Sequence, residues 1–245
     1  MMRTLALETH GELMKLMRMP AYAIPVLLFP TMFYSLFGLS FGGREQATYL
    51  IGSYAAFGVI GAALFGLGVG VAVERAQGWL SLKRASPMPA GAYFGSKVVT
   101  SMMFGAIITI LLAILGVAFG DVALSARQWL LLLVTMMLGA APFCAMGCAL
   151  AYLVGPNSAP AVTNLIYLPM SFASGLWVPL EALPKFVQNI APALPPYHLG
   201  RMALRILGFG NTSVVLHAGV LAGFAVVFMA IAIWLYRRDE GVTFG

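Results

Sequence analysis

Histidines and cysteines are the side chains of this sequence that most readily act as catalysts or metal ligands. The three histidines, His10, His198 and His217, fall in different regions, and no Asp, Glu or Cys completes a metal-ligand cluster around them. A structural or catalytic zinc site needs three or four such groups together. Cys144 and Cys148 share one helical face inside an apolar run, which is more typical of small packing residues. We therefore expect no catalytic residue and no metal centre in this chain.

A phosphate-binding loop would indicate that the chain hydrolyses ATP by itself. That loop requires the pattern G-x-x-x-x-G-K-[ST]. The nearest string, residues 91–98, reads GAYFGSKV and lacks the Gly-Lys-Ser/Thr order. The glycines of residues 66–70 fall inside an apolar run and lack the spacing of a dinucleotide site. No cofactor is expected in this chain, and any ATP hydrolysis would belong to a separate protein.

The charged segment 74–97 is a stronger functional candidate. Its first part, residues 74–89, reads ERAQGWLSLKRASPMP. On a short helix, Trp79 and Leu82 would form an apolar side, and Lys83 and Arg84 a basic C-terminal end. Pro87 and Pro89 would stop that helix. Such a helix on a membrane surface is typical of a docking element for a partner protein. The alternative is an ordinary positively charged loop between two spans.

The composition places these groups in a membrane protein. The 245 residues are 61% hydrophobic and 9% charged, with a mean hydropathy of +0.92, whereas soluble domains hold about 45–50% apolar and about 25% charged residues. So little charge cannot cover the surface of a soluble fold. The net charge of +6 comes from basic residues scattered between apolar runs. That scatter excludes a nucleic-acid-binding face and predicts contact with membrane lipids.

Six apolar runs are long enough to cross a bilayer as helices: 20–41, 47–73, 98–120, 128–154, 159–179 and 213–236. Each run lacks Asp, Glu, Lys and Arg, and none alternates as the strands of a β-barrel do. The predicted fold is an all-α integral membrane protein, a single transmembrane domain over 1–245. Because ion-driven transporters usually carry ionisable residues inside their spans, transport by this chain would need an external energy source.

The distribution of Lys and Arg predicts the orientation of the chain. With six spans both termini share one side, which holds nine basic residues: Arg3, Lys15, Arg18, Arg75, Lys83, Arg84, Lys97, Arg237 and Arg238. The opposite side holds five: Arg44, Arg127, Lys185, Arg201 and Arg205. The excess predicts cytoplasmic termini, a cytoplasmic 74–97 connection and an outward-facing loop over 180–212.

Residues 1–19 have one apolar side when placed on a helix, formed by Met2, Leu5, Ala6, Thr9, Leu13, Leu16 and Met17. We expect an amphipathic helix that lies along the inner membrane surface and leads into the first span at Pro20. The alternative is a frayed, solvated N-terminus.

Two sets of residues carry a resemblance to a known family. The first is in the 74–97 connection: Glu74, Arg75, Gly78, Leu82, Lys83, Arg84, Ser86, Pro87, Tyr93 and Lys97. The second is rich in proline and surrounds the last loop: Pro179, Glu181, Pro184, Pro192, Pro195, Pro196, Tyr197 and Arg201. In order and spacing these sets resemble type-2 ABC export permeases, the membrane halves of ATP-binding-cassette exporters. The resemblance covers essentially the whole chain.

The resemblance implies that residues 74–89 seat in a cleft of a separate ATPase subunit and pass its closure to the membrane helices. The coupling residues would be Glu74, Arg75, Gly78, Trp79, Leu82, Lys83, Arg84 and Pro87, with Glu74 the most important. Two copies of that ATPase would bind ATP and Mg²⁺, beneath a homodimer or heterodimer of permeases. The outer-loop residues Pro179, Glu181, Pro184, Pro192, Tyr197 and Arg201 would belong to a segment that dips back into the membrane.

These observations together predict the permease subunit of a bacterial ATP-driven exporter in the cytoplasmic (inner) membrane. The 15 Met and 16 Phe residues favour a hydrophobic or amphipathic substrate. One alternative is a membrane channel or assembly scaffold that works without an ATPase. The other is a membrane enzyme whose site would use the loop residues Glu181, Lys185, Arg201 and Arg205.

Overall fold

The computed structural model describes residues 2–40, 43–79 and 90–243, and within these ranges all regular structure is helical. The α-helices are α1 (Met2–Met17), α2 (Pro20–Phe33), α3 (Arg44–Ala63), α4 (Gly70–Ala76), α6 (Ala90–Phe119), α7 (Ala126–Leu153), α8 (Ala159–Ala173), α9 (Lys185–Ile190), α10 (Pro195–Leu207) and α11 (Val214–Thr243). Two π-helical segments, η1 (Tyr34–Leu39) and η2 (Leu64–Val69), continue α2 and join α3 to α4. Two 3-10 turns, η3 (Leu180–Ala182) and η4 (Ala191–Ala193), flank α9.

Five helices of the described chain are long and apolar enough to cross a membrane: Pro20–Leu39, Arg44–Ala76, Gly91–Phe119, Ala126–Leu153 and Val214–Arg238. They correspond to five of the six predicted runs. The predicted run 159–179 instead contains the 15-residue helix α8. Gly175, with φ of 76°, ends it, because a left-handed residue lets the Leu176 N–H bond back to the Ser171 carbonyl.

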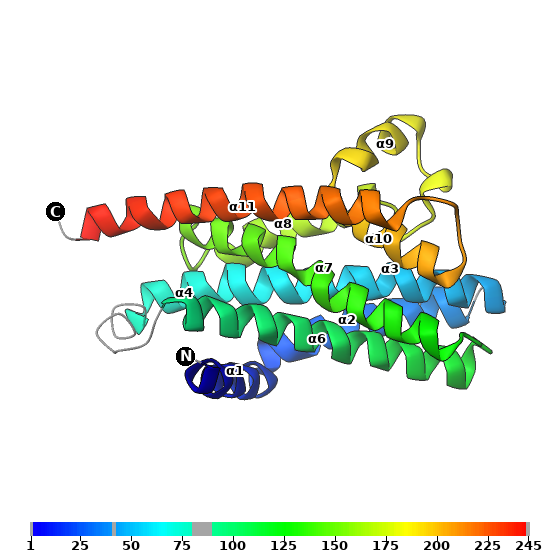
Figure 1. Cartoon of the computed structure of the whole chain (residues 1–245), viewed down its shortest axis with the longest axis horizontal. Coiled ribbons are helices and arrows are strands. Elements are labelled where there is room, and N and C mark those ends of the chain that lie inside the picture. Colours follow the sequence, from blue (N-terminus) through cyan, green and yellow to red (C-terminus); the bar gives the residue numbers. More distant parts are fainter. Residues whose placement is uncertain (1, 41–42, 80–89, 244–245) are drawn as a thin grey trace.

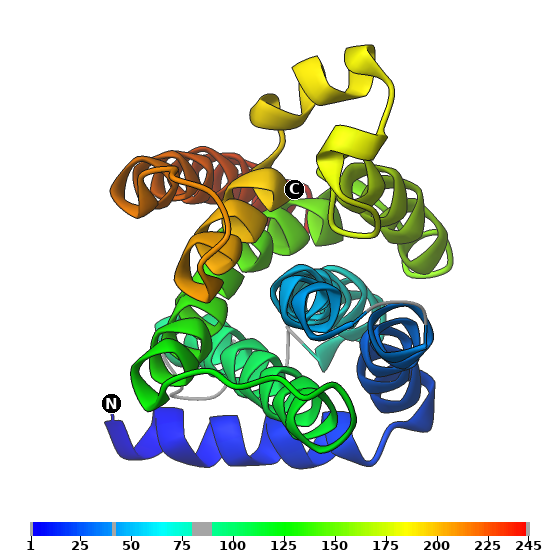
Figure 2. The ribbon, with the colours of Figure 1, turned by 90° about the vertical axis from the view of Figure 1, so that its right-hand side faces the viewer.

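The long helices lie side by side in one bundle (Figure 1). In Figure 1, α1 and the C-terminal part of α11 lie at one end of this bundle, which we call the terminal end. The segment from α9 to α10 lies toward the opposite end, which we call the loop end. Figure 2 shows α1 crossing the bundle, with the long helices viewed along their length above it.

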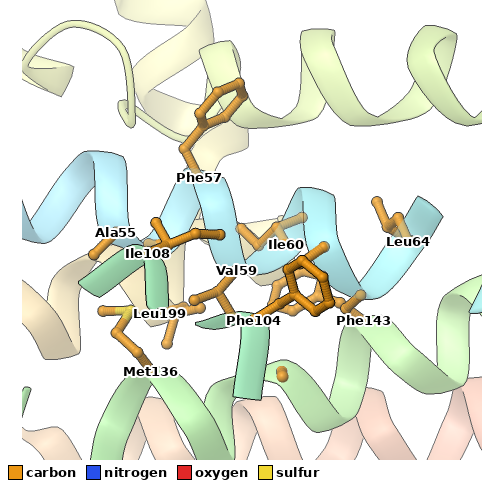
Figure 3. Close-up of a cluster of buried hydrophobic side chains, with 14 of the residues drawn as sticks. Ala55, Phe57, Val59, Ile60, Leu64, Phe104, Ile108, Met136, Phe143 and Leu199 are labelled. Carbon is orange, nitrogen blue, oxygen red and sulfur yellow. The ribbon is translucent and has the colours of Figure 1, made fainter. Parts of the chain in front are cut away.

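Helix α3 forms the axis of the core, and every residue from Leu50 to Ala63 is buried. Figure 3 shows its side chains between those of α6, α7 and α10, with Phe104, Phe143 and Leu199 among the contacts. Two tyrosines also bond its backbone, since Tyr22 donates to the Ala62 carbonyl at 3.0 Å and Tyr167 to the Phe57 carbonyl at 2.8 Å. Because α3 is surrounded in this way, it contacts helices along the whole bundle and fixes their relative positions.

The junction between α3 and α4 packs backbone against backbone. A Cβ atom added to Gly147 of α7 would lie 3.0 Å from the Gly68 nitrogen of η2 and 3.3 Å from the Ala63 carbonyl. A side chain at Gly147 would push these two backbones apart, and glycine avoids this, as is common where membrane helices cross closely. The crossing fixes the start of α4 against α7, and with it the direction in which Glu74 leaves the core.

Large apolar side chains cover the outer face of the bundle. Ile114 of α6, Leu138 of α7 and Val226 of α11 are 58%, 63% and 70% exposed. A soluble protein rarely exposes so continuous an apolar surface. The bundle is that of a multi-pass membrane protein.

The segment 180–212, predicted as a loop, is largely helical. Pro195 and Pro196 begin α10, where a missing N–H costs nothing at the first helical positions. Leu199, Ala203 and Leu207 then form its buried side. In the sequence these prolines carried the resemblance to the family's outer segment, and in the structure two of them begin a helix.

Candidate functional site

Glu74 lies near the end of α4 at the terminal end of the bundle, and its carboxylate receives three donors. Lys15 of α1 and Lys97 of α6 both bond Oε1, Lys97 at 3.0 Å. The Tyr93 hydroxyl of α6 donates to Oε2. Three elements that are far apart in sequence therefore meet at one residue.

A second carboxylate completes the arrangement. Glu12 of α1 pairs with Lys97 at 2.7 Å and with Lys15 at 2.8 Å. We call Glu12, Lys15, Glu74, Tyr93 and Lys97 the Glu74 cluster. Its two carboxylates face two ammonium groups, so the cluster carries no net charge.

The Glu74 cluster is shielded from solvent. The side chains of Lys97 and Glu12 are 2% and 5% exposed, that of Glu74 is 13% exposed, and only Lys15 reaches 38%. Burial by itself would lower the pKa of Lys15, but the Glu74 and Glu12 carboxylates outweigh it and raise that pKa above its ordinary value. Buried ions with this many partners are costly to separate, so the cluster ties α1, α4 and α6 into one unit.

Arg75 connects the same turn to a different helix. Its guanidinium donates to the Val154 carbonyl at 3.3 Å and to the Tyr152 carbonyl at 3.5 Å. It also lies over the Tyr152 ring, 5.4 Å from the centroid. Adjacent residues thus fasten α4 in two directions, Glu74 to α1 and α6, and Arg75 to the C-terminal end of α7.

The remaining residues of the predicted coupling segment are partly outside the described chain. Gly78 has φ of 76° and follows the end of α4, where Gln77 and Gly78 N–H groups bond back to the Val73 and Arg75 carbonyls. Trp79 is 52% exposed. The other four predicted residues, Leu82, Lys83, Arg84 and Pro87, lie outside the described residues.

The predicted outer-loop residues do not converge on a single site. Pro179 and Pro184 precede η3 and α9. Glu181 forms an exposed pair with Arg201 at 3.5 Å, and the Arg201 guanidinium lies 5.3 Å from the Tyr197 ring centroid. The exposed pair is a weak link between η3 and α10, and the Arg201–Tyr197 contact lies within α10.

Sequence reasoning missed a histidine pair at this end. His198 Nδ1 lies 2.8 Å from His217 Nδ1, and His198 Nε2 lies 2.9 Å from the Pro192 carbonyl. Because a carbonyl only accepts, His198 must carry its proton on Nε2, and the His217 Nδ1–H then donates to His198. The pair joins η4, α10 and α11. Burial lowers the pKa of His198, and the Pro192 hydrogen bond opposes that shift.

No metal site accompanies these groups: within the described ranges, three His, Cys, Asp or Glu side chains nowhere come together. Cys144 and Cys148 are buried and free in the bundle. Sequence reasoning also missed the partners of Glu74. The sequence signal for Glu12 and Lys15 is limited to their i,i+3 spacing on one helix. Lys97 was assigned to the 74–97 connection, although it lies within α6.

Known proteins resemble this chain over most of its length. Residues 5–208 match the family described as "ABC-2 type transporter". A curated protein of Bacillus subtilis (strain 168), named "Putative transport permease YvfS", is 25% identical over 247 residues. That match covers 98% of this chain and 100% of the relative.

Proposed function

Because the chain belongs to the ABC-2 type transporter family, we propose that it is the permease subunit of an ATP-driven exporter. It forms the translocation path as a homodimer or heterodimer. Two separate ATPase subunits bind ATP and Mg²⁺ and drive it through the 74–89 connection. The substrate is a hydrophobic or amphipathic compound.

The Glu74 cluster is the observation that carries this proposal. The connection to the ATPase leaves the bundle at Glu74, and this residue is bonded to α1 and α6. Its neighbour Arg75 is bonded to the end of α7. A force applied to the connection is therefore delivered to three helices at once.

The proposed coupling step is mechanical. ATP binding closes the two ATPase subunits and displaces residues 74–89. Since separating buried ion pairs is strongly unfavourable, α1, α4 and α6 move as a unit instead of shearing apart. The close crossing of η2 and α7 at Gly68 and Gly147 passes the movement to the transmembrane part of the bundle.

The proposed topology has six crossings with both termini in the cytoplasm of a bacterium, at the inner membrane. Figure 1 supports an even number, since α1 and the end of α11 share the terminal end. The segment containing α8 supplies the fifth crossing, and α1 lies along the cytoplasmic surface. The excess of Lys and Arg among the connections at this end supports the orientation.

The test is co-purification with the ATPase. The chain is isolated from native membranes in mild detergent, and co-eluting proteins and ATP hydrolysis are measured. We expect a stoichiometric P-loop ATPase that is lost when residues 79–84 are deleted. Glu74→Gln should retain the ATPase but reduce export at least about tenfold, equivalent to about 1.4 kcal/mol, because Lys15 and Lys97 lose the charge that ties them to α4.

Glu181→Gln is the matched control, since it removes a carboxylate at the loop end and should leave export unchanged. Circular dichroism of each variant separates a coupling defect from misfolding. A chain that repeatedly elutes alone and shows no associated ATP hydrolysis would overturn the proposal in favour of a channel or assembly scaffold.

A further inference from the structure

A large cavity opens at the loop end of the bundle, at the opposite end from the Glu74 cluster. Its volume is about 1010 Å³, and it lies between η1, the first turns of α3 and the segment after α8. Six aromatic side chains line it: Phe33, Phe37, Tyr49, Tyr54, Trp177 and Phe209. Small-molecule sites are typically about 300–1,000 Å³ and mostly apolar, so this cavity suits a ligand rather than a few waters.

The aromatic walls are held in place by contacts with one another. The Tyr54 hydroxyl donates to the Trp177 carbonyl at 3.3 Å. Phe33 packs on both, with ring centroids 6.2 Å from Tyr54 and 5.7 Å from Trp177. On the other wall the Tyr49 and Phe209 rings meet edge to face at 5.3 Å. The cavity is therefore largely formed before any ligand enters, which reduces the ordering cost of binding.

The polar groups of the cavity come from the first turn of α3. Arg44 donates to the Ala123 carbonyl at 3.4 Å and Gln46 to the Phe37 carbonyl at 3.0 Å. The Glu45 carboxylate, which also lines the cavity, has no ion pair or hydrogen bond to any part of the chain that the structure describes. The guanidinium and the amide are thus each bonded to a backbone carbonyl, whereas the described residues offer the carboxylate no donor.

Aromatic faces and a carboxylate share one preference, which is for positive charge. The faces of Trp, Tyr and Phe attract cations electrostatically, most strongly where water is excluded. An exposed carboxylate adds a smaller attraction. An anion of the same shape would gain neither of these attractions, and the cation of the cavity, Arg44, has its guanidinium on the Ala123 carbonyl.

We propose that this cavity binds an amphipathic organic cation, an apolar or aromatic body that carries one positive charge. The body occupies the aromatic walls, and the charge lies toward Glu45. As the identity of the exported substrate, this inference rests on the proposed function. As a binding site it is measured on the permease alone.

The probes are tetraphenylphosphonium and tetraphenylborate, which have nearly the same shape and opposite charge. Trp177 reports binding by fluorescence quenching in a variant where Trp79, Trp129 and Trp234 are replaced by Phe. We expect the cation to bind about tenfold more tightly than the anion, as cation–π and ionic contacts together allow. Preference for the anion would overturn the proposal.

Two substitutions separate the two contributions. Glu45→Gln should weaken cation binding about threefold and leave the anion unaffected or improved. Phe209→Leu should weaken the cation about fivefold. Glu8→Gln, which removes a carboxylate of α1 at the opposite end of the bundle, is the control for surface charge and should change neither. Because each probe partitions into the detergent micelle to the same extent whichever variant is present, identical titrations for all variants would show partition only and would refute the site.

The outcome is independent of ATPase coupling. A permease that co-purifies with its ATPase but shows no charge preference keeps the proposed function and loses this inference. A permease that prefers the cation but elutes without an ATPase keeps the binding site and loses the exporter assignment.

Discussion

The two ends of the bundle each contain an ion pair between distant segments, yet the two pairs differ in almost every physical respect. At the terminal end Glu12 and Lys97 are 2.7 Å apart with side chains 5% and 2% exposed. At the loop end Glu181 and Arg201 are 3.5 Å apart with side chains 68% and 24% exposed. Water screens the second pair and not the first. A carboxylate–cation pair therefore stabilises the packing of helices at the terminal end, whereas at the loop end it contributes little to stability.

This difference matches the tasks proposed for the two ends. Force transmission needs elements that resist separation, and the Glu74 cluster supplies them through charges that cannot return to water without losing their partners. Ligand entry needs an accessible cavity with adaptable polar groups, and the loop end supplies aromatic walls with polar groups in the first turn of α3. Predictions at the two ends should accordingly differ in size.

The largest effect is expected from Lys97→Met. Removal of this ammonium leaves the Glu12 and Glu74 carboxylates close together and buried, which typically costs about 3–5 kcal/mol. The measurement is the free energy of unfolding in detergent, by denaturant titration followed with circular dichroism. Lys185→Met removes an exposed ammonium of α9 and should change stability by less than about 0.5 kcal/mol.

A second variant distinguishes the loss of charge in Lys97→Met from a loss of side-chain packing. Glu12→Gln combined with Lys97→Met removes one charge of each sign and should recover part of the lost stability, because only one carboxylate then remains in the cluster with Lys15 as its partner. If the single and double variants unfold alike, the charges are not what holds these helices together.

The difference between the two ends also explains what sequence analysis could predict. Six apolar runs were predicted to span because lipid demands long uncharged segments, and five of them correspond to long apolar helices of the described chain. The same criterion started the third run at Val98, after Lys97, since it treats a charge as the edge of the membrane, whereas α6 already begins at Ala90 and includes this lysine, which two carboxylates neutralise. Glu74 was recognised from its place beside the connection. Its partners were not, because Lys15 lies 59 residues away in the chain and no local pattern encodes that distance.

The histidine pair failed to appear in sequence for a related reason. His198 and His217 belong to α10 and α11, which are brought together by a turn that contains Gly208 and Gly210 at positive φ. Neither histidine has an acidic or thiol neighbour that would mark it. The pair is a product of packing, as is the cavity, whose walls come from four separate segments.

An intermediate effect is expected at this pair. His198→Ala leaves the buried Nδ1–H of His217 without its acceptor, which costs about 1–3 kcal/mol. The wild-type pair should also make stability depend on pH. Burial lowers the pKa of folded His198, so the unfolded chain binds its proton more readily. Stability should therefore fall as the pH drops below about 6.5, the ordinary histidine pKa, and stop falling below the lowered pKa of the folded state.

The pKa of His198 depends on the groups that surround its ring. They are His217 and the Phe224 ring of α11, the Tyr197 ring of α10 and the Pro192 carbonyl of η4, while the Arg201 charge acts on His217. Melting temperatures are measured from pH 5 to pH 8 for the wild type, for His198→Ala and for His10→Gln, which changes an exposed histidine of α1. A wild-type curve that stays flat, or one that keeps its slope in His198→Ala, would contradict the assignment.

The smallest effect on the free energy of unfolding is expected from Glu181→Gln. Its comparison with Glu12→Gln tests directly whether burial makes the two ends differ. The Glu181 side chain is 68% exposed and its ion pair with Arg201 spans 3.5 Å, so its loss should cost less than about 0.5 kcal/mol. Glu12→Gln, the same chemical change in a 5% exposed side chain, leaves Lys97 and Lys15 sharing Glu74 and should cost several times more. Raising the salt concentration to about 1 M should abolish the small effect and leave the large one, since screening acts on exposed charges. If both glutamate substitutions lowered the free energy of unfolding equally, burial would not make the two ends differ. The proposal that the terminal end transmits force would then be contradicted.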